Sequence, residues 1–219
     1  QDTTFTAQID IVNSGQCGDN LYWTIANNTL VISGSGDMYD YTTSSLPEWY
    51  LSNEKITKLI INDGITHIGD SAFAGCENIQ KDLILPNSLQ TIGDYAFQNC
   101  KNITSISFGT DLKSIGDYAF AGCIRIDNMT CPTTRTPDVT IHTFDMVSRY
   151  AYLYVLQSYE RTFKIDPYWG VFDIKTIVEE TDLADLQVQS CKIVKFIKNG
   201  RLLIERNGIL YNARGARVK

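Results

Sequence analysis

Histidine is the side chain that most often moves protons near neutral pH, and this chain of 219 residues has only two. Any Ser-His-Asp or Cys-His device must therefore use His67 or His142. His67 lies at a position where we expect a solvent-facing side chain, and His142 lies in an irregular stretch. We expect neither to be catalytic, and we expect a protein that is not an enzyme.

Metal and cofactor sites need more ligating residues, at closer spacing, than this sequence has. Two histidines and scattered cysteines give no zinc spacing. Asp70, Asp94 and Asp117 form a row of single carboxylates, whereas calcium needs about six to eight oxygen ligands. The glycines are not followed by the helix and lysine of a phosphate-binding loop. We therefore predict no metal and no cofactor, and we interpret the aspartates as caps for backbone N–H groups.

Cysteine is the remaining candidate for side-chain chemistry, with six in the chain. Four of them recur at inward positions of a repeated pattern: Cys76, Cys100, Cys123 and Cys131. Equivalent residues in repeats stack on one another, so we interpret these as buried thiols that pack as small hydrophobic groups. Cys17 and Cys191 lie far apart in sequence, and we expect no bond between them.

The element that must position these residues is a nine-residue phrase that occurs three times. It reads Ile-Gly-Asp-(Ser/Tyr)-Ala-Phe-(Ala/Gln)-(Gly/Asn)-Cys and spans 68–76, 92–100 and 115–123. Its phenylalanines and a fourth beyond them are 24, 23 and 24 positions apart: Phe73, Phe97, Phe120 and Phe144. Such a period predicts a solenoid, in which each copy stacks on the next. We expect the four phenylalanines to form one buried column.

A short run of alternating residues precedes each phrase and predicts a β-strand with one face buried. The side chains expected to point inward are Leu59, Ile61, Leu83, Leu85, Ile106, Phe108, Met129 and Cys131. We expect these strands to stack as a narrow parallel sheet, which leaves a second row of residues on its outer side. This candidate partner-binding face comprises Lys58, Ile60, Asp82, Ile84, Ser105, Ser107, Asn128 and Thr130.

Each phrase also predicts its own local structure. We expect Gly69, Gly93 and Gly116 to adopt a backbone shape that a Cβ would resist. The aspartate after each glycine is expected to cap a short helical turn that carries Ala and Phe inward. Tyr95 and Tyr118 follow two of these aspartates, and we expect them side by side on the outside.

These residues resemble the BspA-type leucine-rich repeat, whose units read roughly Leu-x-x-Ile-x-Leu-Pro, a turn, and Ile-Gly-x-x-Ala-Phe-x-Gly-Cys. The match is nearly complete across the three copies and partial out to Phe144. The resemblance implies a leucine-rich-repeat solenoid of a class found on secreted and cell-surface proteins, many of them from bacteria of the gut and mouth. Its members are generally implicated in adhesion to host proteins or other cells.

The stretches on either side of the repeats are expected to cover the ends of the stack. Strands at 21–25 and 30–34 read as a hairpin, and 46–50 brings aromatic residues onto the first copy. Beyond the repeats, a strand, a short helix and a tryptophan segment resemble the usual ending of the family. The final part resembles a short module frequent on exported proteins of the Bacteroidetes, which implies that source. The predicted α+β solenoid thus divides into an N-terminal β-rich cap at 1–55, repeats at 56–144, a C-terminal cap at 145–180 and a β-meander tail at 181–219.

Charge and composition narrow the classes of partner. The net charge of −6, with both signs interspersed, argues against a nucleic-acid-binding surface. No apolar run approaches membrane-spanning length, so we expect a membrane link only through an export signal or anchor. The chain begins Gln1-Asp2-Thr3-Thr4, and we expect an export signal to have been removed. We expect a monomer.

We therefore expect a secreted or cell-surface, non-enzymatic protein that mediates adhesion by binding extracellular or host proteins through one broad face. Two alternatives stay open. Aromatic residues cluster near both ends, and flat aromatic faces also stack on sugars, which allows a carbohydrate-binding surface module. A structural spacer without its own ligand is the other alternative.

Overall fold

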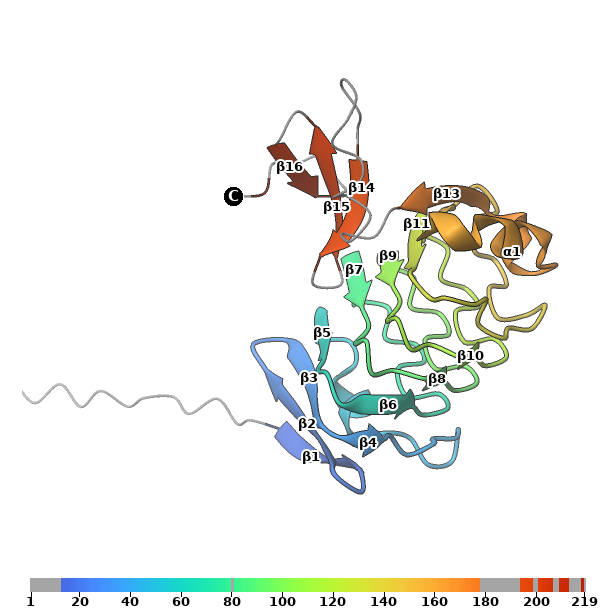
Figure 1. Ribbon diagram of the computed structural model, residues 1–219. Helices are drawn as coiled ribbons and strands as arrows, with labels where there is room; N and C mark the ends of the chain where they lie inside the picture. The colour runs from blue at the N-terminus through green and yellow to red at the C-terminus, as the bar shows by residue number, and fades with distance from the viewer. Residues whose placement is uncertain are drawn as a thin grey trace, which may run out of the picture.

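The computed structural model describes residues 13–79, 81–177, 194–198, 201–206, 209–212 and 218. β-Strands dominate this part of the chain, and apart from short 3₁₀ helices its helical content is α1 (Glu160–Ile165). The strands follow one another up a stack that begins with an antiparallel hairpin and ends beside α1 (Figure 1). Most of them pair in parallel, as the repeats predict.

The N-terminal end of the stack is a sheet built from three antiparallel strands: β1 (Asn13–Gly18), β2 (Leu21–Ala26) and β3 (Thr29–Gly34). Asn27 and Asn28 join β2 to β3, and their φ angles of 47° and 59° give the two-residue turn that suits strand twist. This confirms the predicted hairpin. β5 (Lys58–Ile61) extends the sheet by running parallel to β3. The first repeat strand therefore belongs to this sheet, which corrects the expectation that all repeat strands share one sheet.

The separation of β5 from the next repeat strand has a local origin. Leu59 and Leu83 are 24 positions apart, whereas Leu83 and Ile106 are only 23 apart, so the first copy is one residue longer. The extra length falls between Ile79 and Leu83, where Lys81 has a φ of 72°. Left-handed backbone at Lys81 departs from the extended form at the start of β7, which is the edge strand of its sheet.

Two parallel sheets form the body of the stack. The larger has the order β13-β12-β11-β9-β7, with bounds β7 (Lys81–Ile84), β9 (Ile103–Ser107), β11 (Asn128–Cys131), β12 (Tyr152–Leu156) and β13 (Asp173–Ile177). The smaller has the order β10-β8-β6-β4, with bounds β4 (Gly36–Asp37), β6 (Ile65–Ile68), β8 (Thr91–Ile92) and β10 (Ser114–Ile115). Both contribute to one core, because Leu83 and Ile106 on the larger sheet and Ile68 and Ile92 on the smaller are all buried.

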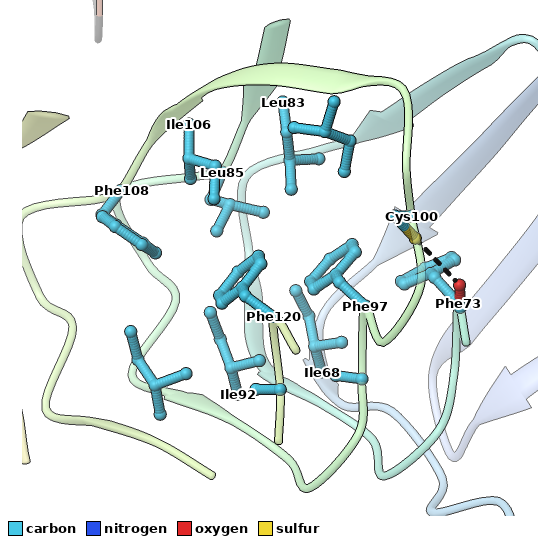
Figure 2. Close-up of a cluster of buried hydrophobic side chains, with 14 of the residues drawn as sticks. Ile68, Phe73, Leu83, Leu85, Ile92, Phe97, Cys100, Ile106, Phe108 and Phe120 are labelled. Carbon is cyan, nitrogen blue, oxygen red and sulfur yellow. Dashed lines mark hydrogen bonds between the residues drawn. The ribbon is translucent and has the colours of Figure 1, made fainter. Parts of the chain in front are cut away.

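Phenylalanine rings fill the space between the two sheets (Figure 2). Phe73 and Phe97 stack with their centroids 5.1 Å apart, and Phe97 and Phe120 at 5.2 Å. Phe144 continues the column at 5.8 Å, so the predicted column is confirmed. These spacings follow the separation of about 4.7–4.9 Å between neighbouring strands, since each strand brings one ring with it.

Tryptophans close both ends of this column. Trp49, in the 3₁₀ helix Glu48–Ser52, stacks on Phe73 at 5.7 Å and donates from Nε1 to the carbonyl of Ala72. At the other end, Trp169 packs edge-on against Phe144 at 5.1 Å and donates to the carbonyl of Pro137. Both indoles are buried, so each end of the apolar interior is covered.

The aspartate of each phrase caps a neighbouring copy. The Asp70 carboxylate accepts a hydrogen bond from the backbone N–H of Asp94 at 2.7 Å, and Asp94 accepts from the N–H of Asp117 at 2.6 Å. Asp40 begins the row by accepting from Asp70, and the Thr140 hydroxyl ends it by donating to Asp117. The residues that follow form turns without a helix, so the predicted helical turn and its N-cap are wrong.

The glycine before each aspartate is required for close approach between copies. A Cβ on Gly93 would lie 2.3 Å from Asp70 Oδ1, and one on Gly116 would lie 2.4 Å from Asp94 Oδ1. Neither glycine has a positive φ, which corrects the expectation of an unusual backbone shape. The left-handed position is instead the residue after the aspartate, with φ of 58° at Tyr95 and 54° at Tyr118.

The cysteines form the predicted ladder of buried thiols. Cys100 Sγ donates to the carbonyl of Phe73 and Cys123 Sγ to that of Phe97, each at 3.2 Å. Burial raises the pKa of the Cys76 thiol, and equally that of Cys123, from 9.0 to about 12. Cys17 is free and buried, whereas Cys191 lies outside the described residues.

The C-terminal segments match the predicted order of strand, helix and tryptophan segment, with β12 and β13 joined to the larger sheet. The tail forms a separate antiparallel sheet of three strands: β14 (Val194–Lys198), β15 (Arg201–Arg206) and β16 (Ile209–Asn212). This order agrees with the predicted meander, whose turns at 199–200 and 207–208 lie outside the described residues.

Candidate functional site

The larger parallel sheet sets its outward side chains in two registered rows. We call these residues the outer sheet face: Asp82, Ser105, Asn128, Tyr152 and Asp173 in one row, and Ile84, Ser107, Thr130, Tyr154 and Lys175 in the other. Residues paired across parallel strands point to the same side of a sheet. The residues between the rows are buried, including Leu83, Ile106 and Leu153, so alternation separates this face from the core.

The structure brings together five of the eight residues of the predicted face as exposed or half-buried side chains: Asp82, Ile84, Ser105, Ser107 and Asn128. Ile84 is 40% exposed. Lys58 and Ile60 lie on β5, in the N-terminal sheet. Thr130 is only 7% exposed, because its short side chain lies between Ser107 and the larger Tyr154 on the adjacent strands.

The half of this face that comes from the C-terminal segments is absent from the face predicted by the sequence. Tyr152 and Tyr154 alternate with buried Leu153 and Val155, a pattern that predicts a strand with outward tyrosines. The strand itself is predicted, and its pairing with β11 joins residues 24 positions apart, such as Asn128 and Tyr152, which is the period of the repeat. The alternation and the period were therefore both available signals for the two tyrosines, whereas the step of 21 positions from Tyr152 to Asp173 departs from the period.

Polar contacts run across the outer sheet face from strand to strand. The Ser105 hydroxyl donates to Asp82 Oδ1 at 2.6 Å. Lys175 Nζ lies 2.8 Å from Asp173 Oδ1 and 5.2 Å from the centroid of the Tyr152 ring. The hydrogen bond to Asp173 raises the pKa of Lys175, so its positive charge is retained at physiological pH. The face thus offers aromatic, charged and hydroxyl groups for recognition, over five strands.

Comparison with known protein families finds six copies of the BspA type leucine rich repeat region over residues 44–155, which is about half of the chain. The chain belongs to the BspA-type leucine-rich-repeat family. A solved structure of a leucine-rich repeat protein from Eubacterium ventriosum is similar over 92% of this chain and 48% of its own, with 22% sequence identity and a TM-score of 0.51. The chain spans about half the length of that protein, and the likeness shows the fold. No curated protein matches the chain.

The histidines of this BspA-type repeat protein lie away from the outer sheet face. His67 Nδ1 lies 2.6 Å from Thr91 Oγ1, and His67 Nε2 lies 3.2 Å from Asp40 Oδ1, so the ring is half-buried and held at both nitrogens. This corrects the expectation of a solvent-facing side chain. His142 stacks on Tyr118 and lies 3.1 Å from Asp145. Within the described residues, no group of three or more acidic, cysteine or histidine side chains is arranged to hold a metal ion.

A second row of aromatic rings stacks on the outside of the repeats. Tyr95 and Tyr118 lie parallel with their centroids 5.3 Å apart, as expected from their matching positions, and His142 continues the row at 4.7 Å. Tyr95 is 39% exposed, so the edges of these rings reach solvent. In the part of the chain that the structure describes, no helix has the length and apolar character needed to cross a bilayer.

Proposed function

We propose that this BspA-type leucine-rich-repeat protein is a non-enzymatic adhesion module that binds an extracellular or host protein through its outer sheet face. We infer that its repeats form a short solenoid with caps at 1–55 and 145–180 and a separate tail at 181–219. We place it on the cell surface or among secreted proteins, as a monomer. The observation that carries the proposal is the pair of registered rows, which offers a broad surface in place of an enclosed site.

The chemistry of the face supports a protein partner. Tyr152 is 42% exposed and Ile84 is 40% exposed, at opposite sides of a row of hydroxyl and amide groups. Tyrosine is one of the residue types that dominate binding energy at protein interfaces. The paired contacts between Ser105 and Asp82 and between Lys175 and Asp173 hold these side chains in place, which lowers the entropy lost on binding.

The test measures binding of the immobilised chain to a panel of purified extracellular-matrix proteins and mucins. A face variant carries Ile84→Asp, Ser107→Arg and Tyr152→Ser. A control variant carries Tyr22→Ser and Leu51→Asp, two exposed positions at the N-terminal end of the stack. We expect the face variant to lose its partner by tenfold or more in affinity, about 1.4 kcal/mol or above, while the control binds as the unchanged chain does. Equal binding by both variants would contradict the proposal.

A carbohydrate-binding surface module is the second candidate, because Tyr150 is 90% exposed and Tyr22 is 53% exposed. Such open rings can stack on sugars. A glycan array separates the candidates: binding lost on Tyr150→Ser or Tyr22→Ser and kept in the face variant would favour the carbohydrate module. Silence toward both panels would favour a structural spacer.

A further inference from the structure

The stretch from β11 to Phe144 is an irregular fourth copy of the repeat, and it departs from the pattern at the turn that leads from the larger sheet to the smaller one. From Phe108 to Ser114 is six positions, but from Cys131 to its counterpart Asp138 is seven. The preceding turns each bury a leucine, Leu89 and Leu112, and the inserted segment from 132 to 138 has none. The longer turn buries Pro132, Thr133 and Pro137 in place of a leucine, and a hollow lies beside Leu112.

This hollow is an open cleft of about 280 Å³, lined by residues of three successive copies. Gln90 comes from the second, Thr110 and Lys113 from the third, and Thr134 and Arg135 from the fourth. Its volume lies just below the range of roughly 300–1,000 Å³ for sites that hold drug-sized ligands. The cleft therefore has room for one ring-sized group with its substituents, but not for a folded segment of protein.

Two cations of the cleft, Lys113 and Arg135, form no ion pair with a carboxylate within the described residues. Lys113 Nζ donates to Gln90 Oε1 at 2.7 Å, which positions the ammonium group without neutralising it. Among the described residues, the Arg135 guanidinium has neither an ion pair nor a hydrogen bond. Asp111 is the one carboxylate in the lining, and it accepts a hydrogen bond from the Thr110 hydroxyl at 3.1 Å. The lining thus carries a net positive charge on a chain whose net charge is −6.

Backbone donors at the same place add to this charge. The N–H groups of Thr134 and Arg135 make no hydrogen bond within the described part of the chain. Successive N–H groups in a bend form concave sites that favour anions. The Thr133 hydroxyl is already used, since it donates to the Arg135 carbonyl at 2.6 Å and holds the bend in shape.

We propose that this cleft binds the sulfate group of a sulfated saccharide. Lys113, Arg135 and the two N–H groups meet the oxyanion, because charge-assisted hydrogen bonds to such groups are the strong ones. The Thr110 and Thr134 hydroxyls and the Gln90 amide then face the hydroxyl groups of the sugar ring. The cleft is separate from the outer sheet face, so it adds a second ligand to the proposed function and does not depend on it.

The test is calorimetric titration of the full chain with a sulfated disaccharide, its desulfated parent, inorganic sulfate and inorganic phosphate. Binding of the sulfated disaccharide is expected, with affinity lowered at least tenfold for the parent and for both inorganic anions. Lys113→Gln and Arg135→Gln are each expected to lower the affinity about tenfold, as for loss of one charge-assisted hydrogen bond. Lys55→Gln makes the same change in net charge at an exposed position elsewhere and is expected to change nothing.

Both cleft side chains are exposed, so the variants are expected to unfold at the same temperature as the unchanged chain. Absence of binding by the sulfated disaccharide would overturn the proposal, as would binding that Lys55→Gln weakens as much as Lys113→Gln does. Inorganic phosphate or sulfate bound as tightly as the disaccharide would show that the cleft does not recognise a sugar. None of these results bears on the outer sheet face, whose variants differ.

Discussion

The residue types in the nine-residue phrase are constrained by contacts with the neighbouring copy as much as by contacts within the same copy. Gly93 has no side chain because the Asp70 carboxylate of the preceding copy occupies the space a Cβ would need. That carboxylate in turn satisfies the backbone N–H of Asp94. The glycine therefore allows close packing between copies, and the aspartate makes the hydrogen bond that joins each copy to the next.

Gly93→Ala is expected to lower the free energy of unfolding by about 1–3 kcal/mol, the usual cost of overpacking. Its Cβ would lie 2.3 Å from Asp70 Oδ1 and 2.6 Å from the Asp70 nitrogen. Gly75→Asn is the matched control: its φ is 72°, no atom lies within 4 Å of its Cβ, and Asn99 occupies the equivalent position with a φ of 59°. Urea denaturation measures both, and equal stability of the two variants would contradict the account.

Buried thiols are expected to be unreactive in the folded protein. In a Cys191→Ser background, none of the other five cysteines should react with a thiol reagent at pH 8, and all five should react in denaturant. Rapid labelling of any of them under native conditions would show that the core opens or that the ladder is exposed.

The same thiols predict a loss of stability in alkaline solution. Burial keeps them protonated, with the pKa of Cys76 raised from 9.0 to about 12. The stabilisation is complete below pH 9, where the unfolded thiol is also protonated, and is lost as pH rises toward 12. Each such thiol contributes up to about 1.4 kcal/mol per pH unit in that range. Cys76→Ala should flatten the dependence of unfolding free energy on pH between 9 and 11, and an unchanged slope would contradict the assignment.

The repeated phrase was enough to single out the glycines and aspartates that join the copies, but not to identify the groups that they contact. The phrase identified Asp70 and Gly93 as special, yet local rules assign an aspartate to the turn that follows it. The true partners lie one copy away, at a distance of 23 or 24 residues. The aspartate and its N–H partner come within hydrogen-bond distance only when successive copies stack. The spacing between stacked copies cannot be read from the sequence of one copy.

At the scale of elements, two aromatic rows run along the stack with different surroundings. Phe97 is fully buried and packs between Phe73 and Phe120, whereas Tyr95 stacks on Tyr118 at the surface. Both rows have nearly the same spacing because both follow the strands. Their contributions to stability should differ, since only the inner row removes its rings from water.

Phe97→Ala is expected to lower the free energy of unfolding by about 3–5 kcal/mol, from lost burial and the cavity left behind. Tyr95→Ala removes a ring of similar size from the outer row and should cost only about 0.5–1.5 kcal/mol. The pair is measured by urea denaturation followed by far-ultraviolet circular dichroism. A larger loss from Tyr95→Ala would mean that the column between the two sheets does not hold the stack together.

The repeat period predicted the strands, the phenylalanine column and the ladder of buried thiols. All three depend on spacing within and between identical copies. It failed where a copy is irregular. The first copy is one residue longer between Ile79 and Leu83, near the point where β5 and β7 fall into different sheets, and the longer turn at 132–138 borders the cleft. Pairing of β12 with β11 keeps the period, since Asn128 and Tyr152 are 24 positions apart, so Tyr152 could have been placed on the outer sheet face in advance. Tyr154 and its partner Lys175 are only 21 positions apart, so the period does not predict the place of Lys175.

The whole molecule presents two surfaces of different character on one scaffold. The outer sheet face is broad and carries both charges, and the cleft is small and carries net positive charge. Capping tryptophans at both ends keep the shared interior closed, so neither surface needs the core to open. This arrangement suits the proposed binding of a protein across the outer sheet face and of a smaller charged group in the cleft at the 132–138 turn.

Hydroxyl-radical footprinting of the complex with the captured partner tests the central claim, that binding occurs on the outer sheet face. Tyr152 and Ile84 are exposed enough to be oxidised in the free chain, at 42% and 40%, and Tyr22 and Tyr39 serve as internal controls at 53% and 44%. Protection of Tyr152 and Ile84 with unchanged labelling of the controls is the result that we predict. Protection confined to Tyr22 and Tyr39 would contradict the claim and place the interface at the N-terminal sheet.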